Sequence, residues 1–96
     1  TIKNKDANIL VIGTNATIKS NLYEIGLKSN GFTNIISIAT PLLVPLVEEN
    51  ILDGQILEAT FDHYFKDLKD KNIDAIILGC THFPLLEERI SNYFNQ

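Results

Sequence analysis

Residues 75–86 of this chain read AIILGCTHFPLL, an apolar run that ends in glycine and cysteine shortly before a proline. The run from Asp74 to Gly79 is typical of a buried strand, and Pro84 suits the first turn of a helix. Between them stands Cys80, the only cysteine of the chain. A helix N-terminus stabilises a thiolate. The stretch therefore predicts a strand that delivers a reactive thiol to the mouth of a helix.

Two further apolar runs have the same layout. Residues 8–13 read NILVIG and precede Thr14, and residues 35–38 read IISI and lead to Thr40. Strands that alternate with helices form parallel sheets covered on both faces. The sequence thus predicts an α/β fold, a three-layer sandwich around a small, mostly parallel sheet. Ligands bind beyond the carboxyl ends of such strands, which predicts one crevice bordered by Thr14, Thr40 and Cys80.

Apolar residues at helical spacing predict the helices between and after these strands. A helix that starts at Thr14 or Asn15 and ends before Gly31 has one apolar face, made of Ile18, Leu22 and Ile25. Residues 41–49 predict a short helix or an irregular segment, and residues 69–72 a polar turn. A longer helix capped by Asp53 buries Ile56, Leu57, Phe61, Tyr64, Phe65 and Leu68. The last helix, near Pro84, faces inward with Leu85, Leu86, Ile90, Tyr93 and Phe94.

The composition indicates a single globular domain. The chain has 96 residues, 45% of them apolar, and a net charge of −4 with a pI near 4.9. Its eight basic residues are scattered, which argues against nucleic acid and anionic membranes as partners, and no apolar run is long enough to span a membrane. A single cysteine forms no internal disulfide, which favours the cytoplasm. The chain starts at Thr1 and has no methionine, which predicts a piece of a longer protein.

Cys80 and its two neighbours are the first candidates for chemistry. His82 could raise the thiolate fraction of Cys80 or pass protons. Backbone N–H groups of the turn at Thr81 could hold an anionic group such as a carboxylate. The alternatives are structural, because a lone cysteine is most often a small buried hydrophobe and Thr81 is equally suited to be a helix N-cap. No spacing of cysteine, histidine and aspartate in the chain fits a metal site.

Two other segments are weaker candidates. Residues 14–17 open a helix after a strand but lack the glycines and the lysine of a phosphate loop, so they predict at most a small-anion site. Glu48 and Glu49 follow an apolar segment near a strand end, where one of them could join the site, although such a pair is ordinarily a solvated helix end. His63 has no comparable neighbour and is expected on a helix face.

Three motifs of the chain resemble those of glutamate racemases. Residues 79–86 (GCTHFPLL) are similar to the second catalytic-cysteine motif of that family. Residues 11–23 (VIGTNATIKSNLY) and 39–49 (ATPLLVPLVEE) are similar to further motifs and follow the family's order. The cysteine motif alone points to the wider group of aspartate, glutamate and hydantoin racemases. The Thr-His pair after the cysteine and the Pro-Leu-Val-Glu run favour the glutamate branch.

The resemblance implies a cofactor-independent enzyme that interconverts L- and D-glutamate and supplies D-glutamate for bacterial peptidoglycan, and hence for cell-wall biogenesis and cell shape. In this family two cysteines on opposite faces of the α-carbon exchange its proton. Carried over by motif, Cys80 abstracts the proton from the L enantiomer, and His82 tunes the thiol. The positions that match or lie near substrate contacts are Thr81, His82, Thr14, Thr17 and Glu48. The resemblance implies no metal and no cofactor.

The chain departs from the family by having no second cysteine. The family's first cysteine lies in an N-terminal half, with an Asp-Ser pair, a Pro-Tyr-Gly turn and an Asn-Thr pair that are all absent here. Residues 1–96 therefore resemble the second, inserted domain of a two-domain racemase, a flavodoxin-like half that lacks the N-terminal domain of the same chain. We expect the isolated chain to be inactive, and its uncovered apolar surface allows a homodimer.

Two other functions stay open at this point. One is a racemase of aspartate or a related amino acid, although aspartate racemases tend to place an acidic residue after Cys-Thr, where this chain has His82. The other is a non-catalytic α/β module for ligand binding or regulation, in which Cys80 is only a core residue. Slow alkylation of Cys80 in the folded protein would favour the non-catalytic module.

Overall fold

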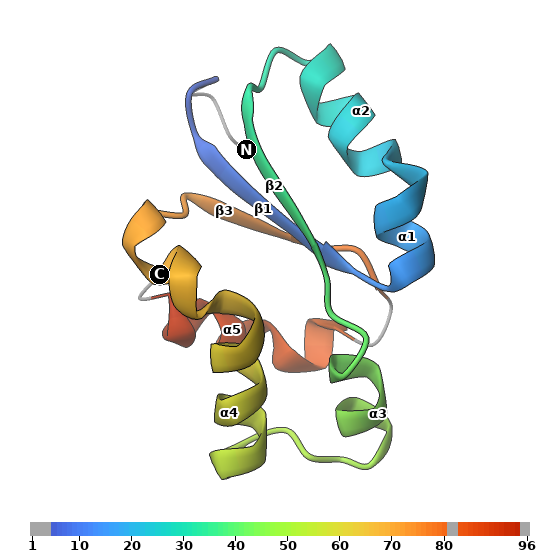
Figure 1. The fold of residues 1–96 in the computed structure, drawn as a ribbon, viewed down its shortest axis with the longest axis vertical. Coiled ribbons are helices and arrows are strands. Elements are labelled where there is room, and N and C mark those ends of the chain that lie inside the picture. The colour runs from blue at the N-terminus through green and yellow to red at the C-terminus, as the bar shows by residue number, and fades with distance from the viewer. Residues whose placement is uncertain (1–4, 81–82, 95–96) are drawn as a thin grey trace.

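A computed structural model describes residues 5–80 and 83–94 of the chain. Its sheet consists of β1 (Asn8–Gly13), β2 (Asn34–Ala39) and β3 (Ala75–Leu78) in the order β2-β1-β3. Both β2 and β3 run parallel to β1 (Figure 1). The predicted small parallel sheet is confirmed, and the carboxyl ends of the three strands share one edge.

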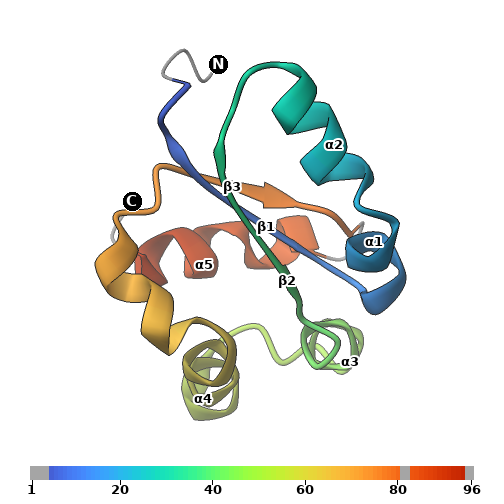
Figure 2. The same ribbon diagram turned by 45° about the horizontal axis from the view of Figure 1, so that its top comes forward.

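Helices cover both faces of this sheet (Figures 1 and 2). One face carries α1 (Asn15–Ser20) and α2 (Leu22–Ser29). The other face carries α3 (Leu43–Glu48), α4 (Gly54–Phe65), the 3₁₀ helices η1 (Lys66–Lys71) and η2 (Phe83–Leu86), and α5 (Glu87–Tyr93). The predicted three-layer α/β sandwich is therefore confirmed, because a helical layer lies on each side of the strands.

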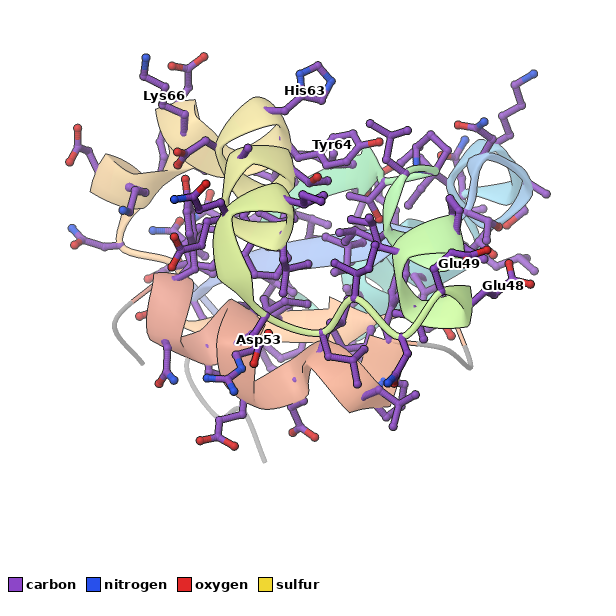
Figure 3. The ribbon with its side chains drawn as sticks, turned by 90° about the horizontal axis from the view of Figure 1, so that it is seen from below. Glu48, Glu49, Asp53, His63, Tyr64 and Lys66 are labelled. Carbon is purple, nitrogen blue, oxygen red and sulfur yellow. The ribbon has the colours of Figure 1, made fainter. Side chains whose placement is uncertain are left out.

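The long helix α4 buries a narrow stripe. Leu57, Phe61 and Phe65 recur every four residues and are all buried, whereas His63 lies exposed on another side of the helix (Figure 3). The prediction that Ile56 is buried was wrong, since its side chain is 59% exposed. One residue corresponds to about 100° of helix rotation, which turns Ile56 away from the stripe of Leu57.

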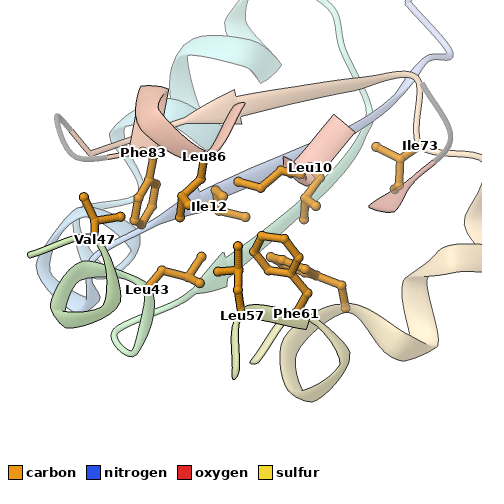
Figure 4. Close-up of a cluster of buried hydrophobic side chains, with 11 residues drawn as sticks. Leu10, Ile12, Leu43, Val47, Leu57, Phe61, Ile73, Phe83 and Leu86 are labelled. Carbon is orange, nitrogen blue, oxygen red and sulfur yellow. The ribbon is translucent and has the colours of Figure 1, made fainter. Parts of the chain in front are cut away.

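The alternation of β1 divides the core between the two faces of the sheet. Ile9 and Val11 are buried toward α1 and α2, and Leu10 and Ile12 are buried toward the opposite helices. The larger cluster joins Leu10 and Ile12 to buried residues of α3, α4, η2, α5 and the segment before β3 (Figure 4), namely Leu43, Val47, Leu57, Phe61, Phe65, Ile73, Phe83, Leu86 and Ile90. The smaller cluster consists of Ala7, Ile9, Val11 and Phe32.

The single helix predicted after β1 is interrupted at Asn21. This residue adopts a left-handed conformation (φ 57°), which asparagine tolerates better than most residues, and its N–H donates to the carbonyl of Ile18. The interruption separates α1 from α2 and changes the direction of the side chains that follow. The predicted buried face was therefore wrong beyond Ile18, because Leu22 is 71% exposed and Ile25 is also exposed.

Two further expectations fail near the ends of helices. The last helix begins as η2, in which residues three apart lie on the same side, so Phe83 and Leu86 are buried while Leu85 is 64% exposed. Leu85 was predicted to face inward. Most of the polar turn predicted at residues 69–72 is instead the end of η1, and the chain turns at Asn72 with a φ of 52°.

Candidate functional site

The three strands deliver Thr14, Thr40 and Cys80 to one edge of the sheet. Backbone hydrogen bonds extend the pairing past the strand ends: the N–H of Thr40 donates to the carbonyl of Gly13 at 2.8 Å, and the N–H of Gly79 donates to the carbonyl of Ile12 at 2.7 Å. These bonds bring the residues after β2 and β3 against the end of β1. The backbone therefore places the three strand ends at one edge, and a ligand crevice at this edge stays a prediction.

Cys80 lies in the turn between β3 and η2. It is partly buried, and its side chain packs against the larger core cluster. Its carbonyl accepts a hydrogen bond at 3.1 Å from the N–H of Phe83, the first residue of η2. The predicted passage from a strand through the thiol into a helical turn is thus present. Thr81 and His82, which the sequence places in the site, lie outside the described residues.

Gly79 allows the close approach of β3 to β1. A Cβ atom on Gly79 would lie 2.9 Å from the carbonyl oxygen of Ile12, 3.2 Å from Cγ2 of Thr17 and 3.3 Å from Cε2 of Tyr23. The first distance is too short for a side chain, so a residue without a Cβ is required directly before Cys80. The other two distances show that side chains of α1 and α2, which lie on the sheet face opposite the larger core cluster, reach the residue before Cys80. Nothing in the sequence signals the contact of Tyr23, because it joins segments far apart along the chain.

Thr14 and Thr17 interact with each other at the start of α1. Thr14 is the N-cap residue, and its Oγ1 accepts a hydrogen bond from the N–H of Thr17 at 3.2 Å. The same hydroxyl donates to Oγ1 of Thr17 at 3.0 Å. The methyl group of Thr17 lies beside Gly13 at the end of β1 and beside Gly79 just after β3, 3.1 and 3.2 Å from the positions of their Cβ atoms. Contact of either threonine with a substrate stays a prediction.

Thr40 and Glu48 occupy very different environments. Thr40 is fully buried, and its hydroxyl donates to the carbonyl of Gly13 at 3.5 Å, so it lies at the edge without lining an open crevice as the sequence suggested. Glu48 ends α3, and Figure 3 shows its carboxylate with that of Glu49 at the outer end of this helix. Both carboxylates are exposed, and their part in the site stays a prediction.

Several polar side chains of α4 and α5 surround a cleft away from the strand ends. A cleft of about 550 Å³ there is lined in part by Asp53, Asp62, Arg89 and Tyr93. The hydroxyl of Tyr93 donates to Oδ1 of Asp62 at 2.7 Å. Burial, together with the hydrogen bond and negative charge of Asp62, raises the pKa of Tyr93 well above its usual range. Asp53 occupies the predicted N-cap position of α4 without a side-chain cap hydrogen bond, and its carboxylate lies 3.8 Å from Arg89 as an ion pair.

The described part of the chain offers neither a metal site nor a membrane-spanning helix. No group of three or more histidine, cysteine, aspartate or glutamate residues within 5–80 and 83–94 could hold a metal ion. Among the same residues, no helix combines the length and the apolar character needed to cross a membrane. The strand ends around Cys80 therefore remain the candidate site for this chain.

Comparison with known proteins gives consistent matches over nearly the whole chain. The model of the Asp/Glu/Hydantoin racemase family matches residues 1–96. The chain is 56% identical over 89 residues to a glutamate racemase of a Nitratiruptor species, covering 93% of this chain and 34% of that protein. It is 53% identical over 93 residues to a glutamate racemase of Helicobacter pylori, covering 97% and 36%. The chain spans about a third of the length of these curated relatives.

Two solved structures share the fold. The glutamate racemase of Campylobacter jejuni subsp. jejuni superposes with a TM-score of 0.90 at 50% identity, over 95% of this chain and 36% of that one. The glutamate racemase of Francisella tularensis subsp. tularensis, solved in complex with D-glutamate, superposes with a TM-score of 0.82 at 38% identity, over 92% and 34%. The architecture of this chain is thus that of one part of these larger chains.

Proposed function

Because this chain belongs to the Asp/Glu/hydantoin racemase family, we propose that it forms one half of the catalytic site of a glutamate racemase. The names of the similar proteins and the D-glutamate bound in one similar structure support glutamate as the substrate. The length of the relatives supports a longer parent protein, in which residues 1–96 are a single α/β domain inserted after an N-terminal domain.

The observation that carries this proposal is the place of Cys80. It follows a parallel strand at the edge of the sheet, where ligands of such folds bind, and it is partly buried rather than enclosed in the core. A thiolate at this edge can reach a substrate held between this domain and the rest of the protein. A deeply buried cysteine with apolar surroundings would be inert.

Racemisation then proceeds by two thiols. The thiolate of Cys80 takes the α-proton of L-glutamate, and the C–H electron pair stays on the α-carbon as a carbanion. A thiol of the missing domain gives its proton to the opposite face, which forms D-glutamate and leaves a thiolate there. In the reverse direction the two thiols exchange roles. Each proton transfer is balanced by these sulfur atoms, so the reaction needs no cofactor.

The other predicted residues support this step. His82 favours the thiolate of Cys80 and, with Thr81, contacts the substrate. Thr14 or Thr17 and Glu48 complete the half-site. Thr14 keeps hydrogen-bonding capacity for a ligand, because a hydroxyl oxygen has a second lone pair beyond the one that accepts from Thr17. The parent enzyme works in the cytoplasm of a bacterium, supplies D-glutamate for peptidoglycan and assembles as a homodimer.

The test is racemisation by the full-length protein that contains this chain. Circular dichroism follows the conversion of L- and D-glutamate, with Cys80→Ser as the key variant and Glu58→Gln, exposed on α4, as the control. We expect conversion in both directions, its collapse in Cys80→Ser, and normal turnover in the control. Turnover of aspartate but not glutamate would reassign the substrate, and turnover that survives Cys80→Ser would overturn the proposal. The isolated 96-residue chain is expected to be inactive.

A further inference from the structure

The residue before the thiol meets three elements. The N–H of Gly79 donates to the carbonyl of Ile12 in β1 at 2.7 Å. The methyl group of Thr17 in α1 and the ring of Tyr23 in α2 lie 3.2 and 3.3 Å from the position of a Cβ on Gly79. Gly79 has no side chain of its own to fix its place. Its position therefore depends on these neighbours.

Tyr23 has no evident role in the core. None of the side chains of α1 and α2, all of which the structure describes, is buried, and Tyr23 itself is 42% exposed. The ring atom that meets Gly79 is Cε2, the carbon next to the one that bears the hydroxyl. The outer end of the ring, not its base, thus lies beside the turn of Cys80. The ring therefore borders the strand end while lying outside both core clusters.

Thr17 is fixed by its own hydroxyl. Oγ1 of Thr17 accepts a hydrogen bond from Thr14 at 3.0 Å, which sets the rotamer and directs Cγ2 to the strand ends. That methyl group meets both Gly13 and Gly79, at 3.1 and 3.2 Å from the positions of their Cβ atoms. Thr17 therefore spans the ends of β1 and β3. A shift of its methyl group would move the residue that precedes the thiol.

We propose that Thr17 and Tyr23 are positioning residues, which set the place of Cys80 by packing against Gly79. The inference rests on the proposed function, because it concerns the thiol that exchanges the proton. Proton transfer at carbon requires the thiol within close reach of the α-carbon, and a misplacement of about 1 Å can lower the rate about 100-fold. This role belongs to the methyl group of Thr17 and the ring of Tyr23, which lie beside Gly79. They act through the backbone of Gly79.

Four variants of the full-length protein test this proposal. Tyr23→Ala removes the ring, Tyr23→Phe keeps the ring and loses the hydroxyl, and Thr17→Ser keeps the hydrogen bond to Thr14 and loses the methyl group. Ile25→Ala is the matched control, an exposed apolar residue on the same helix as Tyr23. For each variant, kcat and KM for both enantiomers are measured together with the midpoint of thermal unfolding.

We expect Tyr23→Ala to lower kcat by about 10-fold to 100-fold with little change in KM. Tyr23→Phe should restore most of the loss, Thr17→Ser should show a smaller loss in kcat, and Ile25→Ala should show none. The proposal is overturned if Tyr23→Ala keeps its kcat. It is also overturned if Tyr23→Phe loses as much as Tyr23→Ala, since the hydroxyl would then be the active group, or if Ile25→Ala loses as much, since α2 would then act only through stability.

A second measurement does not depend on racemase activity. The rate of alkylation of Cys80 by iodoacetamide is followed by mass spectrometry of the peptide that contains it. Tyr23→Ala should raise this rate several-fold, because the turn loses the ring beside it, while Tyr23→Phe and Ile25→Ala should match the parent. An unchanged rate in Tyr23→Ala overturns the positioning role. Absence of glutamate turnover by the parent would overturn the proposed function alone.

Discussion

The two faces of the sheet differ in what they bury. The face of α3, α4 and α5 encloses a continuous cluster that includes Phe61, Phe65 and Phe83. The face of α1 and α2 encloses only a small cluster among the described residues, and Phe32 is its one buried aromatic ring. Yet the thinly packed face supplies Thr17 and Tyr23, which reach the residue before the thiol. The larger core thus stabilises the domain, and the face of α1 and α2 supplies side chains beside the thiol turn.

The aromatic rings show the same difference between the two faces of the sheet. Phe65 lies 5.9 Å from Phe61, 6.1 Å from Tyr93 and 5.4 Å from Phe94, measured between ring centroids. These tilted arrangements are favourable for aromatic pairs and join α4 to α5. On the other face, the amino group of Lys5 lies over the ring of Phe32 at 4.2 Å. One face therefore has a network of rings, and on the other the one buried ring among the described residues is covered by a lysine.

The largest expected effect is the loss of a ring from the larger core. Phe65→Ala should lower the free energy of unfolding by about 3–5 kcal/mol, because a fully buried ring leaves a cavity. Urea unfolding of the full-length protein, followed by circular dichroism, measures the change. Ile56→Ala on the same helix is exposed and should change stability by no more than about 0.5 kcal/mol. Equal losses in the two variants would contradict the contribution of the buried ring of Phe65 to the larger core.

The next effect comes from a methyl group added at the strand end. Gly79→Ala would place a Cβ 2.9 Å from the carbonyl oxygen of Ile12 and should cost about 1–3 kcal/mol while lowering kcat at least 10-fold. Gly26→Ala is the matched control, since no described atom lies within 4 Å of its added Cβ in the middle of α2. It should stabilise the helix by about 0.5–1 kcal/mol. Normal kcat in Gly79→Ala would break the link between this contact and the site.

A smaller effect is expected at the start of α1. Thr14→Ala removes the oxygen that accepts from the N–H of Thr17 and should cost about 1 kcal/mol of stability. Thr14→Ser keeps the hydroxyl and should restore most of that loss. Both variants are compared by thermal unfolding, and the KM for glutamate is measured alongside. A stability loss shared equally by Thr14→Ala and Thr14→Ser would show that the cap contributes nothing.

The smallest expected effect is a change in stability at alkaline pH, and it comes from Tyr93, which packs against the larger core. The raised pKa of Tyr93 means that the folded state keeps its proton at a pH where an unfolded tyrosine, with a pKa of about 10, loses it. This contribution to stability is complete below about pH 10 and decreases as the pH rises further. Tyr93→Phe should therefore flatten the fall of stability above about pH 10, as followed by urea unfolding at several pH values. An identical slope in the parent and in Tyr93→Phe would contradict the interaction with Asp62.

Patterns within short stretches of the sequence predicted the strands and the buried stripe of α4. Apolar runs ending in Gly13 and Gly79 predicted the strands, and their parallel order placed Thr14 and Cys80 at one edge. The buried stripe through Leu57, Phe61 and Phe65 was also visible in the spacing. These features depend on patterns within a few residues, which a single sequence displays.

Other features depend on a single backbone angle or on distant segments. The left-handed Asn21 turns Leu22 outward, and asparagine gives no certain signal of that angle within a helical pattern. The 3₁₀ start of the last helix likewise decided that Leu85 faces solvent. The contact of Tyr23 with Gly79 requires the whole sheet to be assembled first. The roles of Thr81 and His82, which lie outside the described residues, stay predictions.

The most direct test follows modification and activity together. The full-length protein is treated with iodoacetamide, with and without glutamate, and the modified fraction of Cys80 is measured by peptide mass spectrometry as racemisation is assayed. We predict that activity falls in step with modification of Cys80 and that glutamate slows both. Racemisation that persists after Cys80 is fully modified would contradict the claim that this thiol, at the end of β3, carries the proton.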